Sequence, residues 1–221
     1  MRPLPLLGGR QGGNGIVALD AIGTSAANNS TTSENYTGIT VGTGAQRALV
    51  CAITFSLAVT GLTLTWGSQA MTLIISRADS NGMTAQLWGL VAPASGNQTL
   101  AISWTGSANF QMDCASFTGV NQAGGLTTFF NANSAAGNSA SPTVTCSGIA
   151  AHDAAMDSIE VQQALASPTQ TNIYTGAGGA VNNGGSSYAL GSGGTVTFGW
   201  TSGGGVTAAP WASVCVGIAH S

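Results

Sequence analysis

Charged side chains are scarce in this chain of 221 residues, since Asp, Glu, Lys and Arg together make up 5%, against about a quarter of an average soluble domain. There is no lysine, and the four arginines and seven acids give a net charge of −3. Such a chain offers no basic surface to neutralise phosphates, which disfavours nucleic-acid binding, and no strong field to steer a charged substrate. Solubility must therefore depend on Ser, Thr, Asn, Gln and the 33 glycines.

Long apolar runs are also missing. No run approaches the roughly 18 residues that would predict a membrane span. The first residues, "MRPLPLLGG", carry a short apolar patch broken by Pro3 and Pro5, rather than the longer apolar region of a secretory signal. We therefore expect synthesis in the cytoplasm and no membrane association. Hydrophobic residues still make up 43%, which is enough to form a core in a domain of this length.

Alternation of apolar with small or polar residues is the dominant pattern. In residues 47–57, "RALVCAITFSL", every second residue from Leu49 to Leu57 is apolar, which is typical of a strand with one side in the core. Segments of strand length follow one another from Ile16 onward, separated by clusters of Gly, Asn, Ser or Pro. This spacing predicts an all-β protein: a single antiparallel β-sandwich over residues 15–221, preceded by an extended arm over residues 1–14.

Three segments are harder to assign. Residues 28–34, "NNSTTSE", are entirely polar and predict a turn. Residues 121–142 predict a long irregular connection with one edge strand near residues 127–130. Residues 150–166, "AAHDAAMDSIEVQQALA", contain good helix formers but also alternate, so the pattern alone leaves both helix and strand open.

Residues 62–76, "LTLTWGSQAMTLIIS", place a serine in a tight break between two alternating runs. A nucleophile elbow requires G-x-S-x-G between a strand and a helix, and Ser68 has neither the second glycine nor a helical segment after it. Small residues at such a position are ordinary turn chemistry. The segment therefore predicts a hairpin in which Leu62, Leu64 and Trp66 line one strand while Met71, Leu73 and Ile75 return along its partner.

The other reactive side chains do not form a recognisable catalytic or metal-binding pattern. His152 and Asp153 are adjacent, and adjacent residues of a strand point to opposite faces, so we interpret His152 as a polar edge residue. Asp79 and Asn81 in "RADSNG" are the best candidates for a calcium site, but a turn capped by these two side chains explains the same letters. We expect no catalytic residue, no metal and no cofactor.

The four cysteines show no C-x-x-C spacing, which disfavours zinc and thiol redox motifs. Cys51 shares the apolar face of its strand. Cys215 instead lies between Val214 and Val216, so its side chain points to the opposite face of its strand from these valines. A reducing cytoplasm favours free thiols, and later exposure to an oxidising medium would favour disulfides within or between subunits. The sequence leaves both outcomes open for Cys51, Cys114, Cys146 and Cys215.

Five tryptophans raise the possibility of a stacking surface for sugars. Such a surface needs several exposed side chains on one patch, but these residues lie on at least four predicted strands, where packing in a core is the commoner role. The residues are Trp66, Trp88, Trp104, Trp200 and Trp211.

A set of landmarks occurs in a fixed order along the chain: "RALVCAI", "LTWGSQAMTLI", "QLWGLVAPASGNQTLAISWTG", "CASFTGVNQ", "AHDAAMDSIEV" and "WASVCVGIA". In this order the chain resembles a broad family of low-charge β-sandwich domains found in phage virion and bacterial surface proteins, over nearly all residues after 14. The resemblance implies a jelly-roll-like sandwich without established catalytic residues, and a strand at "AHDAAMDSIEV". The cysteines, the missing lysines and the N-terminal arm depart from the family's pattern.

The arm carries Arg2, Leu4, Leu6 and Leu7 on a proline-stiffened segment with no obvious place in the sandwich. It is either a disordered terminus or a tether whose leucines become buried on a neighbour. We expect a non-enzymatic structural protein on the surface of a bacteriophage particle, a capsid decoration or head-fibre protein that docks through this arm on the major capsid protein or neighbouring subunits. A homo-oligomer is expected, with a trimer favoured. The alternative is a carbohydrate-binding or adhesive module of a tail fibre or bacterial surface protein.

Overall fold

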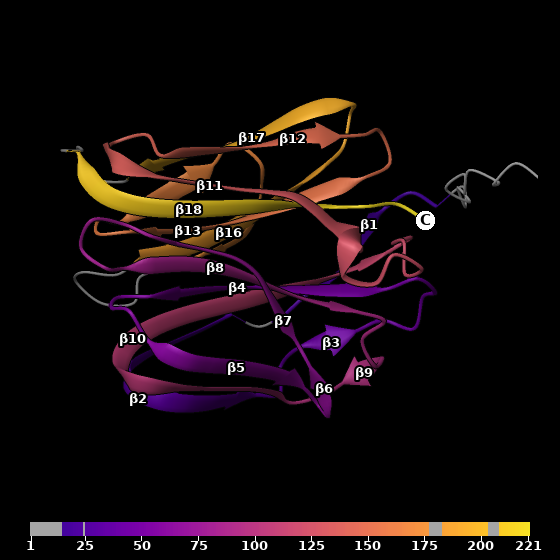
Figure 1. Cartoon of the computed structure of the whole chain (residues 1–221), viewed down its shortest axis with the longest axis horizontal. Helices are drawn as coiled ribbons and strands as arrows, with labels where there is room; N and C mark the ends of the chain where they lie inside the picture. The colour runs from indigo at the N-terminus through magenta and orange to yellow at the C-terminus, as the bar shows by residue number, and fades with distance from the viewer. Residues whose placement is uncertain (1–14, 24, 177–182, 203–207) are drawn as a thin grey trace, which may run out of the picture.

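The computed structural model describes residues 15–23, 25–176, 183–202 and 208–221. In this part of the chain, antiparallel strands form four sheets, and a 3-10 turn at Gly125–Thr128 is the one helical element. Figure 1 shows the strands stacked in layers, with β12 and β17 at the top of the view and β2 and β5 at the bottom. The predicted all-β antiparallel sandwich class is confirmed. None of the described residues form an apolar helix long enough to cross a membrane.

The largest sheet has eight strands and curls back on itself; we call it the curled sheet. Its longest strand, β10 (Leu100–Thr118), contains Gly106 at φ +99°. The part before Gly106 pairs with β5 and the part after Phe110 pairs with β4, so β10 belongs to two layers (Figure 1). The other strands are β1 (Ala18–Ile22), β2 (Ala26–Tyr36), β4 (Ala48–Phe55), β5 (Thr60–Trp66), β6 (Gln69–Ala70), β7 (Thr72–Ala78) and β8 (Thr84–Val91).

The curl encloses the first hydrophobic core. Phe55, Trp104 and Phe110 pack together at its centre, with ring centroids 5.2 Å apart for Phe55 and Trp104 and 5.1 Å apart for Trp104 and Phe110. Cys51 of β4 and Cys114 of β10 lie directly opposite each other and form a disulfide inside this core. The curled sheet is therefore held by its own core and by a covalent crosslink between two of its central strands.

Two further sheets cover one side of the curled sheet. The middle sheet consists of β11 (Phe129–Ser139), β13 (Ala154–Val161), β15 (Thr171–Thr175), β16 (Asn183–Leu190) and β18 (Ala209–Ile218). The outer sheet consists of β12 (Thr143–Ile149), β14 (Leu165–Pro168) and β17 (Gly194–Ser202), and a short pair joins β3 (Thr40–Val41) to β9 (Gly96–Asn97). A second core, with Val50, Phe117 and Met156, lies between the curled and middle sheets, and a third, with Ala155 and Phe198, lies between the middle and outer sheets.

Strand β13 explains why residues 150–166 are ambiguous in the sequence. All eight of its residues are buried, because the middle sheet is covered on both faces. A strand buried on both faces has no need for polar residues at every second position, so "AAMDSIEV" shows only a weak alternation. The strand implied by the resemblance is confirmed here, and the helix is wrong.

Two loop predictions are also wrong. Residues 28–34 lie within β2 and pair with β10 rather than forming a turn. The polar sequence is tolerated because β2 pairs only with β10 and exposes Ser33 and Asn35 to solvent. Residues 121–142 contain the eleven-residue strand β11, which pairs with β18, so most of this segment is not an irregular connection. The edge strand predicted near residues 127–130 is present, because β11 begins at Phe129 and lies at the edge of its sheet, but it is much longer than predicted.

The hairpin predicted at residues 62–76 is only partly present. Gly67, at φ +57°, and Ser68 turn the chain from β5 into the two-residue strand β6. Strand β7 then pairs with β8 at the opposite end of the sheet, so Leu73 does not return along the β5 strand. Only Met71 separates β6 from β7, and its N–H donates to the Leu64 carbonyl at 2.9 Å. The curl brings the two ends of the sheet together, which local alternation cannot reveal.

Candidate functional site

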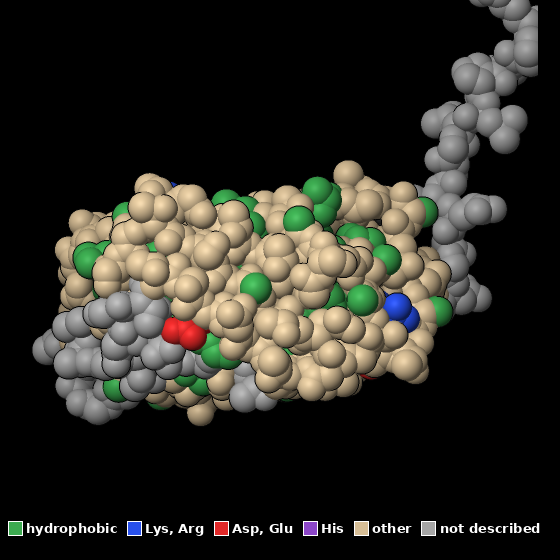
Figure 2. Space-filling view, turned by 90° about the horizontal axis from the view of Figure 1, so that it is seen from below, with side chains coloured by type: hydrophobic (Ala, Val, Ile, Leu, Met, Phe, Trp, Pro, Cys, Tyr) green, Lys and Arg blue, Asp and Glu red, His purple; other side chains and the backbone are tan. Residues whose placement is uncertain are grey.

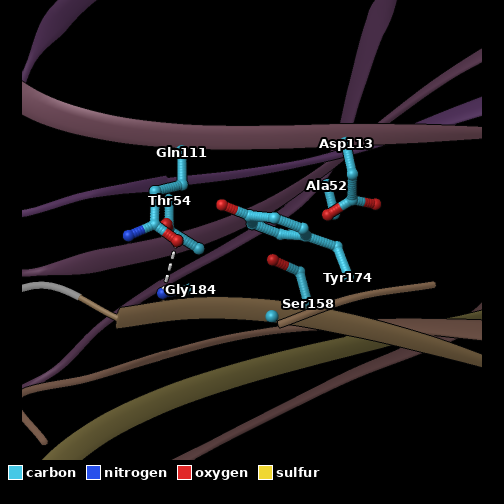
Figure 3. A pocket seen from close by; sticks show the side chains of 8 residues that line it. Ala52, Thr54, Gln111, Asp113, Ser158, Tyr174 and Gly184 are labelled. Carbon is cyan, nitrogen blue, oxygen red and sulfur yellow. Dashed lines mark hydrogen bonds between the residues drawn. The ribbon is translucent and has the colours of Figure 1, made fainter. Parts of the chain in front are cut away.

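The most unusual feature of the interior is a polar layer between the curled and middle sheets. Gln111 and Asp113 project from β10 toward the middle sheet, and Tyr174 of β15 lies between them in the view of Figure 3. The Gly184 N–H donates to Gln111 Oε1 at 2.9 Å, and the Ser186 hydroxyl donates to Asp113 Oδ1 at 2.6 Å. These two bonds connect β10 directly to β16 across the sheet interface.

Burial raises the pKa of Asp113 to about 7, with a further rise from the nearby Asp157, although the hydrogen bond from Ser186 lowers it. A carboxyl with such a pKa is a candidate acid or base if a substrate can reach it. The hollow beside it, lined also by Thr54 and Ser158, does not admit even a water molecule. Asp113 is therefore closed to any substrate in this structure, and its role is to join two sheets.

Asp157 of β13 points the other way, toward the outer sheet. Its Oδ1 accepts bonds from the Ser187 N–H at 2.6 Å and the Ser187 hydroxyl at 2.8 Å, and its Oδ2 accepts a bond from Trp200 Nε1 at 2.7 Å. Burial raises the pKa of Asp157 to about 7 despite these donors, each of which lowers it. The carboxyl joins β13 to β16 and to β17 of the outer sheet.

Glu160 is the third buried acid and has no hydrogen-bond partner on either carboxyl oxygen among the described residues. Burial, and then the charge of Asp79, raises the pKa of Glu160 to about 9. The side chain is therefore protonated at neutral pH, which removes the cost of burying a charge. No group of three or more His, Cys, Asp or Glu side chains that could hold a metal ion occurs in the described ranges.

The candidate calcium residues Asp79 and Asn81 form a capped turn. Asp79 Oδ1 accepts bonds from the Asn81 N–H at 2.8 Å and the Met83 N–H at 3.0 Å. The sequence suggested such a turn as a simpler explanation than a calcium site, because Asp side chains commonly accept a bond from the backbone N–H two residues later. The structure contains this turn.

The two histidines meet at the C-terminal end of the chain. His220 Nδ1 lies 2.7 Å from Asp153 Oδ1, which also accepts the His220 N–H at 3.0 Å, and the Ala150 N–H donates to Asp153 Oδ2 at 2.8 Å. The rings of His152 and His220 contact edge to face at 5.8 Å. Within the described part of the chain no hydroxyl or thiol bonds to either imidazole, so a nucleophile, base and orienting acid are not assembled here. Nothing in the sequence indicated that Asp153 and His220 would meet, because 67 residues separate them.

All five tryptophans are buried, the most exposed being Trp88 and Trp211 at 7%. Trp66 Nε1 donates to the Ala94 carbonyl at 2.9 Å, and Trp211 Nε1 donates to Ser139 Oγ at 3.0 Å. Buried rings cannot stack on sugars, so the tryptophan platform considered from the sequence is absent.

The cysteines divide into one disulfide and two buried thiols. Cys51 and Cys114 are joined, whereas Cys146 and Cys215 are free. Cys215 faces the third core while Val214 and Val216 face the second, which confirms the opposite orientation inferred from the alternation. The arm residues Arg2, Leu4, Leu6 and Leu7 lie outside the described residues.

The face of the molecule drawn in Figure 2 is mostly uncharged, with scattered apolar side chains and only a few charged ones. Hollows open on the described surface. One, of about 500 Å³, lies between the β7–β8 turn and β11 and is lined by Arg77, Asp79 and Asn138; another, of about 210 Å³, is lined by Leu73, Leu126 and Phe129. Neither hollow contains a histidine or a cysteine.

The chain matches no family model, no curated protein and no solved structure.

Proposed function

We propose that this protein is a non-enzymatic structural component of a bacteriophage particle, a capsid decoration or head-fibre protein. The observation that carries the proposal is the placement of the polar groups with shifted pKa values, Asp113, Asp157 and Glu160, which are buried between stacked sheets. Enzymes place such groups in pockets that a substrate can enter. Here the fold uses two of them, Asp113 and Asp157, as hydrogen-bonded links between sheets.

The low surface charge supports the same role. With 5% charged residues and a net charge of −3, neighbouring copies repel each other only weakly. A particle surface displays many copies at short spacing, so a weakly charged, mainly Ser, Thr, Asn and Gly surface is suited to it. Symmetric homo-oligomers are the common arrangement for such proteins, and we propose a trimer.

Residues 1–14 are the proposed attachment segment. The described chain begins at Gly15, which lies beside Ser221 and Gly119, so residues 1–14 join the folded part next to Ser221. If fully extended, fourteen residues would span at most about 50 Å, which is enough to reach a neighbouring subunit or the capsid surface. Leu4, Leu6 and Leu7 would supply the buried contacts and Arg2 a charged one.

The proposal is tested on particles. Mass spectrometry of purified virions from a lysate of cells carrying the gene should detect this protein at a copy number comparable to that of a capsid component. Particles lacking the gene should rebind the purified full-length chain in co-sedimentation and should fail to rebind a chain lacking residues 1–14 or carrying Leu4→Ser, Leu6→Ser and Leu7→Ser together. Leu190→Ser, which changes a 52% exposed leucine in the folded part, is the matched control and should bind normally.

Two results would contradict the proposal. Absence of the protein from virions would refute the particle role itself. Undiminished rebinding of the chain without residues 1–14 would refute only the proposal that this segment attaches the protein to the particle. Light scattering of the purified protein at several concentrations tests the trimer separately, and a strictly monomeric mass would refute it.

A further inference from the structure

Cys146 and Cys215 are buried together in the third core, although they belong to different sheets. Cys146 is on β12 of the outer sheet, Cys215 is on β18 of the middle sheet, and both side chains are fully buried. Hydrogen bonding with the Cys215 thiol lowers the pKa of Cys146, and the same interaction raises the pKa of Cys215. The chain therefore places two thiols in one buried cluster, on two sheets between which the described residues form no disulfide.

Strand β11 connects the strands that carry the two cysteines. Its Asn133 is the register partner of Cys215, and the Asn133 side-chain NH₂ donates to the Thr145 carbonyl, one residue before Cys146, at 2.8 Å. The Asn131 side chain donates to the Ser147 carbonyl at 2.9 Å, and Cys146 Sγ donates to the Asn131 carbonyl at 3.3 Å. The two asparagines thus hold β12 on both sides of Cys146.

An irregularity in β11 makes this arrangement possible. Its pairing with β18 shifts register between Phe130 and Asn133, and Asn131 has a φ of +48°. Asparagine is one of the few residues other than glycine that adopts this conformation readily. The irregularity leaves the Asn131 carbonyl unpaired with β18 and available to the Cys146 thiol. The irregularity of β11, its register with β18 and the side chains of Asn131 and Asn133 therefore hold β12 and β18 in place around the two cysteines.

We propose that Cys146 and Cys215 are the site of a second intrachain disulfide, which joins the outer sheet to the middle sheet. The reaction consumes a disulfide oxidant such as oxidised glutathione. The thiolate of one cysteine attacks a sulfur of the oxidant and releases one glutathione thiolate. The second cysteine, after losing its proton, attacks the resulting mixed disulfide and releases the other glutathione. Two protein thiols thus become one disulfide, and one oxidised glutathione becomes two thiols.

Both thiols are closed to solvent in the folded chain, so the exchange takes place during folding, before the outer sheet closes over β18. The bond then depends on folding in an oxidising medium or on refolding there, rather than on exposure of the finished protein. Cys51 and Cys114, which are already joined within the first core, supply an internal reference for oxidation in the same molecule.

The test is a peptide map of the whole wild-type chain. The protein is unfolded and reduced, refolded in a mixture of reduced and oxidised glutathione, and alkylated with iodoacetamide in denaturant so that every remaining thiol is labelled. Digestion without reduction should then yield a crosslinked peptide pair containing Cys146 and Cys215 and no alkylated cysteine. Refolding with excess reductant should yield all four cysteines alkylated.

Alkylation of both Cys146 and Cys215 in molecules whose Cys51–Cys114 crosslink has formed would overturn the proposal, as would crosslinks of either residue to Cys51 or Cys114. Cys146→Ser and Cys215→Ser should each leave one free thiol on the remaining partner and lower the melting temperature of the oxidised protein. The wild-type map decides the matter even where a serine variant does not fold.

Discussion

Trp200 and Asp157 join the outer sheet to the middle sheet through one hydrogen bond, in which Trp200 Nε1 donates to Asp157 Oδ2 at 2.7 Å and both side chains are buried. The other oxygen of the same carboxyl accepts two bonds from Ser187. A single aspartate therefore connects β13, β16 and β17. Because the interior excludes water, each lost partner leaves a buried oxygen that nothing replaces.

Trp200→Phe removes this donor while keeping most of the aromatic volume. We expect the free energy of unfolding to fall by roughly 2–4 kcal/mol, from a lost bond to an acidic group and the small cavity left behind. Urea unfolding followed by circular dichroism at fixed pH measures the change.

Trp211→Phe is the matched control for that substitution. Trp211 is also buried and donates to Ser139 Oγ at 3.0 Å, but its acceptor is a neutral hydroxyl, so we expect a smaller loss of about 1 kcal/mol from the bond. Equal losses in the two variants would show that Asp157 makes no special contribution.

The three buried acids predict a stability that declines as the pH rises. Burial raises the pKa of Asp113 and of Asp157 to about 7 and that of Glu160 to about 9, whereas the unfolded values are near 4. The folded chain then binds more protons than the unfolded chain above about pH 4. Stability from these groups is therefore complete below about pH 4 and is lost as the pH rises through 7 for the aspartates and through 9 for Glu160. Each carboxyl can lower the free energy of unfolding by at most about 1.4 kcal/mol per pH unit.

Urea unfolding at pH 4.5, 6, 7.5 and 9 checks this trend. Glu160→Gln removes one titrating group at a position where neither oxygen has a hydrogen-bond partner. In this variant the decline between pH 7.5 and 9 should flatten while the decline between pH 4.5 and 7 persists. A wild-type stability that rises from pH 4.5 to 7 would contradict the raised pKa values.

Local alternation predicted which residues of β4 share a face, since Leu49, Cys51, Ile53 and Phe55 all lie in the first core. The prediction that only one side of this strand is buried is wrong, because Val50 and Ala52 on its other face lie in the second core. Leu57 was assigned to the same face as Cys51 but is 55% exposed, since β4 ends at Phe55 and the period of two ends with it. Alternation carries information only as far as the strand continues.

Contacts between sheets could not be predicted in the same way. The pairing of Cys51 with Cys114 and of Asp153 with His220 depends on which strands become neighbours, and their members are 63 and 67 residues apart. Asp113 and Asp157 were scattered acids in the sequence, because only the stacking of three sheets gives them their partners.

The curled and middle sheets approach each other closely at Gly184. A Cβ atom at this position would lie 2.5 Å from Thr54 Oγ1 and 3.0 Å from Gln111 Oε1. Since overpacking a well-packed interface typically costs 1–3 kcal/mol, we expect Gly184→Ala to lower the free energy of unfolding by about that amount. Thermal or urea unfolding measures the loss.

The clash with Thr54 can be removed separately. Thr54 Oγ1 has no hydrogen-bond partner among the described residues, so Thr54→Ala removes the clashing atom without breaking a bond. We expect it to restore most of the stability lost in Gly184→Ala, and a double-mutant cycle measures the coupling. Gly193→Ala is the contrasting control, because Gly193 has a φ of +91° and open space around it. Its loss of about 1 kcal/mol comes from the backbone alone and should be unaffected by Thr54→Ala. If Thr54→Ala failed to rescue Gly184→Ala, the sheets would not be in contact at this pair.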